Sequence, residues 1–520
     1  MLRRLQMINP KIKFWLKRSN SLKPNAVIGS INKRVVFLFG AFQVFVFLPA
    51  LRNPIPWSDD WTYIYFANDP NRSVLHDAIA SGRPILGIVD QFAYQSEFIT
   101  SNFIILQLLS LSGLLLLQLA FYSRLIKIGF EHQISIFASL ALILIPGIQG
   151  YVYFLSCFPY SWACLFGYLS YSLINSSARK RTVIGYILLT GAFLIYPAGA
   201  MFYFLGYFTD FILRFKQESK FRSNIAHLFS IILKIALCSI VSILIGKVSS
   251  TFYGIEQASR IEFVSNLESF IDKVVWASTR LFVSEFRIFT VASPSALRAA
   301  IEAAVLFSLF VFFILKPFKV LTWNRTFNYC LFLAIPLLGA LPNLLIRENQ
   351  FEFRTLTATY AMSLVLWVFF LHQFLKQVFL NSTLKDRFAL QNINRAIGLC
   401  CVLLLLPTVF YVQRDSRNLW TEPSFVRDEI TRKTLQNVKS VDKSSICMVI
   451  PEQVYSPLKR LGVYSMRSDL VSDWVPVPYM RKQLENFNLD TSRKITVFKN
   501  KGDCDSLSIL IDYTDLAGRN

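Results

Sequence analysis

The sequence is poor in charged residues. Only 17% of its 520 residues are Asp, Glu, Lys or Arg, whereas 54% are apolar. A water-soluble chain of this length needs far more charge to cover its surface, so the composition excludes an ordinary soluble protein. The mean hydropathy of +0.44 points the same way. The chain is therefore expected to be an integral membrane protein.

Histidine and cysteine are also scarce, with four and eight residues. None of them has the spacing that is typical of metal ligands, so no metal or other cofactor is predicted, although a metal is not excluded. Most cysteines lie in or beside apolar runs and are expected to pack as small apolar side chains. Cys447 and Cys504 lie near the C-terminus, where they are able to form a disulfide if their compartment is oxidising.

The apolar residues occur in blocks of about the length that crosses a bilayer as a helix. We read eleven spans, at residues 35–51, 102–122, 133–148, 152–174, 183–197, 200–213, 224–247, 296–315, 326–345, 356–375 and 396–413. The predicted fold class is an α-helical polytopic membrane protein with about eleven spanning helices and a small C-terminal α/β domain.

The net charge of +22 is distributed unevenly. Residues 1–34 and the loops on the same side of the predicted spans carry 25 basic residues against three acidic ones, whereas the opposite loops carry nine against 13. Such an excess of Lys and Arg marks cytoplasmic loops. A multi-pass protein of the inner or plasma membrane is therefore predicted, with a cytoplasmic N-terminus and an extracytoplasmic C-terminal domain. Because the basic excess reports topology, no nucleic-acid partner is expected.

Three parts follow from this pattern. Residues 1–34 are expected to be a basic cytoplasmic tail, and residues 35–413 a membrane domain that includes an outer loop at 52–101. Residues 414–520 carry 17 basic and 14 acidic residues and no spanning run. Within this last part the pattern predicts strands near 446–450, 494–498 and 507–512 and helices near 425–438 and 478–486.

The outer loop contains two short apolar stripes at helical spacing, at residues 74–79 and 85–93. The sequence Gly82-Arg83-Pro84 separates them and is typical of a turn. Each stripe is too short to cross a bilayer. Both are therefore predicted to form helices along the outer membrane surface.

Two adjacent carboxylates, Asp59 and Asp60, follow the first span within the sequence Trp57-Ser-Asp-Asp-Trp61. At a membrane boundary such a pair can act as a general base, bind a cation or cap a helix. The plainer interpretation is that Ser58 or Asp59 caps the next helix while the two tryptophans anchor in the interface.

Three arginines of the outer face suit a phosphate group. Arg83 lies in the outer loop, and Arg347 and Arg354 bracket a short charged stretch before the tenth predicted span. Guanidinium groups present a fork of donors that matches phosphate oxygens. If these segments converge, carboxylates face guanidinium groups at the depth of lipid headgroups, as sugar transfer from a lipid carrier requires. The alternative is that they are ordinary interfacial arginines.

These features resemble the GT-C superfamily of integral membrane glycosyltransferases, and within it the bacterial O-antigen glucosyltransferase type. The likeness rests on Asp59-Asp60, on Gly82-Arg83-Pro84, and on the order of spans, surface helices and outer C-terminal domain. It implies a sugar donor linked to polyprenyl phosphate, a cell-surface glycan or lipid-linked acceptor, and inversion at the anomeric carbon. By this resemblance Asp59 or Asp60 is the base, and Asp59 is favoured, with Asp60 as its orienting neighbour. Arg83, Arg347 and Arg354 are expected at the donor phosphate. Separately from the resemblance, Trp57, Trp61 and Tyr196 are expected at the sugar or acceptor.

Two other functions stay open. A transporter or flippase of lipid-linked sugars is expected to show internal repeats, broken helices and polar residues at the bilayer midplane. No repeat is visible in the sequence. A polymerase of the O-antigen type shares the lipid carrier but places its main functional residues in large outer loops between later spans. The early acidic pair favours the transferase.

Overall fold

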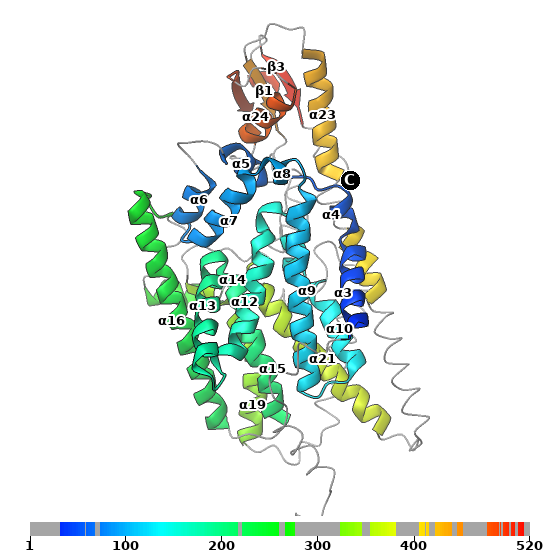
Figure 1. The fold of residues 1–520 in the computed structure, drawn as a ribbon, viewed down its shortest axis with the longest axis vertical. Helices are drawn as coiled ribbons and strands as arrows, with labels where there is room; N and C mark the ends of the chain where they lie inside the picture. Colours follow the sequence, from blue (N-terminus) through cyan, green and yellow to red (C-terminus); the bar gives the residue numbers. More distant parts are fainter. Residues whose placement is uncertain are drawn as a thin grey trace, which may run out of the picture.

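The computed structural model shows a bundle of helices with a small α/β domain at one end (Figure 1). The structure describes residues 32–57, 59–67, 73–216, 221–258, 266–275, 323–345, 354–380, 405–410, 412–414, 422–438, 445–450, 476–487, 489, 492–498, 501–504 and 508–513. The predicted span at 296–315 and Arg347 lie outside these residues.

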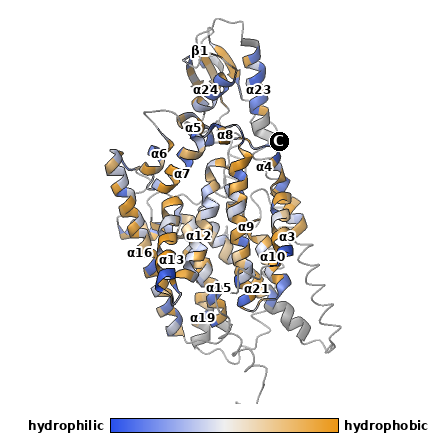
Figure 2. Ribbon diagram, viewed as in Figure 1, coloured by the Kyte–Doolittle hydropathy of each residue, from blue (hydrophilic) through white to orange (hydrophobic). Residues whose placement is uncertain are grey.

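Among the described residues, two helices are long and apolar enough to cross a membrane. They are α9 (Ile104–Lys127) and α16 (Phe221–Tyr253). A third crossing is formed if α10 (His132–Leu142) and α11 (Pro146–Tyr153) are one span, although the two are bent by 54°. The bundle helices are largely hydrophobic along their length, as expected in lipid (Figure 2). The count of eleven spans stays a prediction.

The bend between α10 and α11 corrects one boundary of the sequence analysis. A span at 133–148 followed by a loop at 149–151 was expected, but residues 149–151 lie inside α11. Pro146 has no N–H to donate to the helix before it, which favours a break at this point. The chain then continues through η2 (Leu155–Cys157).

Further helices make up the rest of the described bundle. They are α3 (Lys33–Val46), α4 (Leu48–Arg52), α12 (Phe158–Ile174), α13 (Arg179–Ile195), α14 (Pro197–Ala200), α15 (Phe202–Lys216), α19 (Trp323–Ala334), η5 (Ile335–Ala340), α20 (Leu341–Leu345) and α21 (Thr357–Leu380). Small residues allow close contact: a Cβ at Gly167 of α12 would lie 2.7 Å from the carbonyl oxygen of Gly199 in α14. Such contacts are typical of membrane bundles.

Short helices lie between the bundle and the α/β domain (Figure 1). They are α5 (Asp59–Phe66), α6 (Val74–Ala80), α7 (Pro84–Gln95) and α8 (Glu97–Thr100). The two helices predicted from the stripes of the outer loop are confirmed as α6 and α7. Gly82 has a φ of 71° in the turn between them, a conformation that favours glycine.

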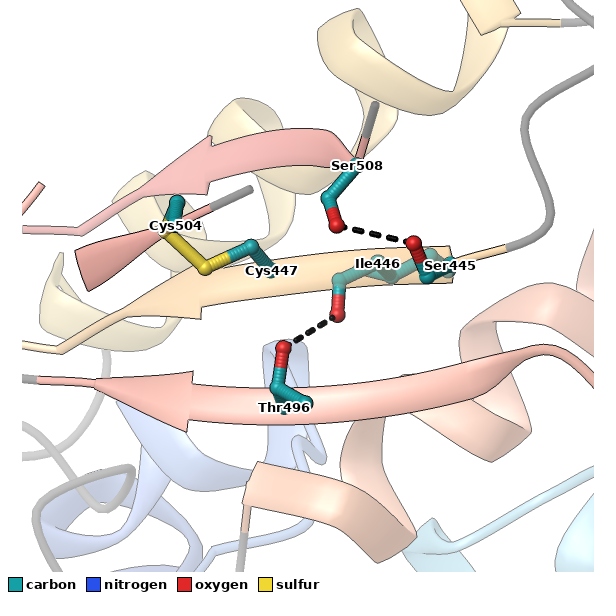
Figure 3. Close-up of a disulfide and its surroundings, with 6 residues drawn as sticks. All are labelled: Ser445, Ile446, Cys447, Thr496, Cys504 and Ser508. Atoms are coloured by element: carbon teal, nitrogen blue, oxygen red, sulfur yellow. Dashed lines mark hydrogen bonds between the residues drawn. A yellow bond between two sulfur atoms is a disulfide. The ribbon is translucent and has the colours of Figure 1, made fainter. Parts of the chain in front are cut away.

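The C-terminal residues form the predicted α/β domain. Three parallel strands, β1 (Ser445–Val449), β2 (Lys494–Phe498) and β3 (Ile509–Asp512), pair in the order β2-β1-β3, with Ile446 opposite both Ile495 and Ile509. Two helices, α23 (Glu422–Val438) and α24 (Pro476–Asn486), accompany the sheet. A disulfide joins Cys447 to Cys504, as the sequence allowed (Figure 3).

Candidate active site

Asp60 is completely buried and ties the start of α5 to the bundle. Its Oδ1 accepts a 2.7 Å hydrogen bond from the backbone N–H of Ser156, and its Oδ2 accepts one of 3.1 Å from the N–H of Leu155. The N–H of Trp57 donates to Oδ2 at 2.9 Å, and the hydroxyl of Tyr94 donates to Oδ1 at 3.3 Å. Asp60 therefore joins α5, α7 and η2 through one side chain.

Burial raises the pKa of Asp60 from 3.8 to about 6, because the protein interior disfavours the charged form. The hydrogen bonds from Trp57, Ser156 and Leu155 act in the opposite direction. Desolvation is the larger effect. Asp60 is thus a poorly accessible group whose main contacts are backbone donors, which fits an orienting residue better than a base.

Asp59 lies in the first turn of α5, where a negative charge is favourable beside the helix N-terminus. Its side chain is half-buried, in contrast to that of Asp60. The charge of Asp59 influences Tyr63 and Cys157, and the charge of Asp60 also influences Cys157. Ser58 lies outside the described residues. Of the two carboxylates, Asp59 is the more accessible.

Arg83 follows the glycine turn and lies beside two stacked tyrosines. The rings of Tyr160 and Tyr196 are parallel within 3°, with centroids 3.9 Å apart. Arg83 donates to the Tyr160 hydroxyl at 3.5 Å, and its Cζ is 5.5 Å from the centroid of Tyr196. A guanidinium group at this distance is attracted to the ring face. The turn therefore places the Arg83 side chain in contact with α12 and with the residue at the start of α14.

Arg354 approaches the same tyrosines from the segment that precedes α21. Its Cζ lies 5.9 Å from the ring centroid of Phe154, and its carbonyl oxygen accepts a 2.7 Å hydrogen bond from the hydroxyl of Tyr151. Tyr151 contacts Tyr160 edge to face, with centroids 5.6 Å apart. Both Arg83 and Arg354 interact electrostatically with Tyr160 and with Tyr196. Two of the three predicted arginines are thus near one tyrosine cluster.

A carboxylate and a guanidinium group meet the same short segment of chain: Arg354 lies against Phe154, and Asp60 accepts hydrogen bonds from the next two residues, Leu155 and Ser156. The charges of Arg354, Asp60 and Asp59 all act on Cys157. Those of Asp59 and Arg83 both act on Tyr63. The helices α5, which carries both carboxylates, and α7, which follows Arg83, lie at the end of the bundle that faces the α/β domain (Figure 1).

The three aromatic residues predicted at the sugar or acceptor are buried, with Trp57 3%, Trp61 5% and Tyr196 4% exposed. Trp57 packs in the bundle core. Trp61 packs against the α/β domain, and Tyr196 is stacked on Tyr160. Little ring surface is left for a sugar in this conformation. The predicted sugar contacts of these residues stay predictions.

Asp90 is a residue that the sequence analysis missed. It is completely buried in α7, and neither of its carboxylate oxygens has a hydrogen-bond partner within the described ranges. Burial raises the pKa of Asp90 well above its usual range, and the charge of Asp60 adds to the effect. The available signal was its position, because Asp90 falls within the apolar stripe at residues 85–93.

The described part of the chain holds no group of three or more His, Cys, Asp or Glu side chains that could bind a metal ion. No protein-family profile matches the sequence, and no curated protein matches it. The function has to be argued from the site itself.

Proposed function

We propose that this protein is an integral membrane glycosyltransferase that moves a sugar from a polyprenyl-phosphate-linked donor to a glycan or lipid-linked acceptor on the outer face of the membrane. The GT-C likeness of the sequence suggests this reaction. The observation that supports the proposal is that Asp60 and Arg354 contact neighbouring residues of the segment 154–156, while the charges of Asp59 and Arg83 both influence Tyr63, in a chain with helices long and apolar enough to cross a membrane.

In the proposed reaction, Asp59 removes the proton from an acceptor hydroxyl. The oxygen then attacks the anomeric carbon of the donor sugar, and the bond from that carbon to the phosphate oxygen breaks with inversion. The polyprenyl phosphate leaves with the bonding electrons, and its charge is stabilised by Arg83 and Arg354. Asp60 keeps α5 at a fixed position through η2.

The same assignment explains why two adjacent carboxylates are present. A general base has to reach its proton, which the half-buried Asp59 can do and the enclosed Asp60 cannot. Arg347, which lies outside the described residues, is proposed as a third phosphate contact from the sequence alone. The predicted topology, with the site at the extracytoplasmic end, belongs to the same proposal.

The test is sugar transfer by the purified full-length chain in lipid nanodiscs. Synthetic polyprenyl-phosphate hexoses serve as donors and a cell-envelope glycan extract serves as acceptor. We expect Asp59→Asn to lower the rate by about 10²–10⁴, the usual contribution of a positioned base. Asp77→Asn, in α6 of the same outer segment, is the matched control and should keep full activity. Unchanged transfer in both Asp59→Asn and Asp60→Asn would defeat the assignment.

One observation favours a second candidate, a flippase of lipid-linked sugars. The 54° break between α10 and α11 is the kind of interrupted helix that transporters use at substrate sites. Liposomes that contain the protein and a fluorescent polyprenyl-phosphate sugar separate the two functions. A flippase exposes the probe to an external quencher without consuming it, whereas a transferase releases polyprenyl phosphate.

A further inference from the structure

Trp61 connects the α5 helix to the C-terminal α/β domain. Asp60, its neighbour in sequence, is bound to η2 of the bundle, whereas the ring of Trp61 packs against α24. The Trp61 and Tyr479 rings meet edge to face, with centroids 4.9 Å apart. Successive residues of α5 are thus held by two different parts of the protein.

Arg427 of α23 completes this contact. Its Cζ lies 5.0 Å from the ring centroid of Trp61 and 4.5 Å from that of Tyr479. Its Nε donates a 2.8 Å hydrogen bond to Asp428, which also accepts a 3.0 Å bond from the Tyr479 hydroxyl. The guanidinium group therefore lies against two aromatic rings, one from α5 and one from α24, that also touch each other.

Arg427 is only 1% exposed, although arginine is rarely buried unless it is paired. Removing a charge from water is costly, and a buried guanidinium is retained where it makes specific contacts. Here its contacts bridge the α/β domain and the helix that carries the proposed base. An eight-residue helix has little stability of its own, so α5 depends on such tertiary contacts.

We infer that the C-terminal domain is a positioning element of the active site, and that Arg427 is the residue through which it fixes α5 and thereby Asp59. Arg427 acts through Trp61 and does not touch the reacting atoms. The catalytic consequence rests on the proposed function. The mechanical coupling between the domain and α5 does not.

Hydrogen exchange measured by mass spectrometry on the full-length chain in nanodiscs tests the coupling directly. Arg427→Met replaces arginine by an unbranched, uncharged side chain. In this variant we expect the α5 amides to exchange at least tenfold faster than in wild type. Arg432→Met is the matched control, because Arg432 lies on the same helix but is exposed and pairs with Glu429 and Gln436 of that helix. It should leave α5 unchanged.

A second variant approaches the contact from the other side and guards against a domain that fails to fold. Trp61→Leu removes the ring by a substitution that lies outside α23, α24 and the sheet. The peptides of α23 and α24 should lose protection while β1 keeps it. Unchanged exchange of α5 in Arg427→Met, with β1 still protected, overturns the inference. So does unchanged exchange of α23 and α24 in Trp61→Leu.

Sugar transfer provides the catalytic readout. If Arg427 positions the base, Arg427→Met should lower kcat while the KM for the polyprenyl-phosphate sugar stays the same, and Arg427→Lys should not restore the rate, since an ammonium group cannot stack as a guanidinium does. If kcat/KM falls because KM rises while kcat stays the same, a positioning role is contradicted. If the wild-type chain transfers no sugar, the proposed function fails while the exchange result still decides the coupling.

Discussion

Tyr160 and Tyr196 are stacked face to face, with ring centroids 3.9 Å apart and planes 3° apart. The pair joins the first turn of α12 to the start of α14. Arg83 contacts the pair from the outer loop, and Arg354 lies near it on the side of Phe154. Arg83 is therefore placed directly on the tyrosine pair, whereas Arg354 is connected to it through Tyr151, whose hydroxyl donates to the Arg354 carbonyl and whose ring meets both tyrosines edge to face.

The stack gives a first prediction. Tyr196→Leu should destabilise the protein by about 1 kcal/mol beyond the loss of buried area, because the aromatic pair is lost. It should also raise the KM for the polyprenyl-phosphate sugar, since Arg83 loses its ring contact. Tyr196→Phe is the control: the hydroxyl forms no hydrogen bond within the described residues, so stability and KM should stay near wild type. Thermal unfolding in nanodiscs and steady-state kinetics measure both. Equal behaviour of the two variants would contradict the role of the ring.

The buried Asp60 predicts how stability depends on pH. Its pKa is about 6 in the folded protein and 3.8 when exposed, so the folded state holds the proton more tightly. The stability linked to this proton is fully present below pH 3.8 and is lost as the pH rises through 6. A pKa shift of this size corresponds to roughly 3 kcal/mol in the free energy of unfolding.

The measurement is the difference in thermal stability between wild type and Asp60→Asn at pH 4 and at pH 7. We expect wild type to lose stability relative to the variant as the pH rises, because only wild type ionises at this position. Asp60→Asn should also be less stable than wild type at pH 4, since an amide cannot accept all of the N–H groups that face the carboxyl. A pH-independent difference would show that Asp60 does not titrate in this range.

For Asp90 we expect a substitution to stabilise the protein, whereas Asp60→Asn is expected to destabilise it at pH 4. A buried polar group without a partner costs about 1–3 kcal/mol. Asp90→Leu, which is similar in size and apolar, should therefore raise the melting temperature. If the carboxyl serves the site, transfer should fall in the same variant, as is common where stability is given up for function. Glu97→Gln, at an exposed position of α8, is the control and should change neither. A lower melting temperature for Asp90→Leu would mean that the carboxyl is stabilising.

The sequence predicted local elements well and contacts between distant segments less well. The stripes of the outer loop became α6 and α7, and the three strands were found within one or two residues, because both depend on the spacing of apolar residues. The sequence analysis favoured Asp59 over Asp60 as base, but the hydrogen bonds that enclose Asp60 could not be predicted, since they come from the backbone of Leu155 and Ser156 in η2. Arg427 was missed for the same reason, because its burial depends on Trp61.

The disulfide between Cys447 and Cys504 closes a loop with a sequence separation of 57. Constraining an unfolded chain with a loop of this length is worth about 4 kcal/mol on the loop-entropy scale. Replacing both cysteines by alanine should therefore increase hydrogen exchange in β1, β2 and β3. Cys330→Ser is the control, because Cys330 is a free, exposed thiol of the bundle. If the double variant exchanges like wild type, the bond does not stabilise the sheet.

The turn that carries Arg83 is supported by a glycine of α16. A Cβ at Gly246 would lie 3.3 Å from both the Cα and the carbonyl oxygen of Gly82. Gly246→Val should therefore push the turn away and lower the free energy of unfolding by about 1–3 kcal/mol, as overpacking usually does.

Gly191→Val is the matched control, because a Cβ at Gly191 of α13 meets nothing within 4 Å. Since both glycines are helical, the change in helix propensity is common to the two variants. A KM for the polyprenyl-phosphate sugar that rises in Gly246→Val alone would link this contact to the phosphate site, and equal effects of the two variants would exclude that link.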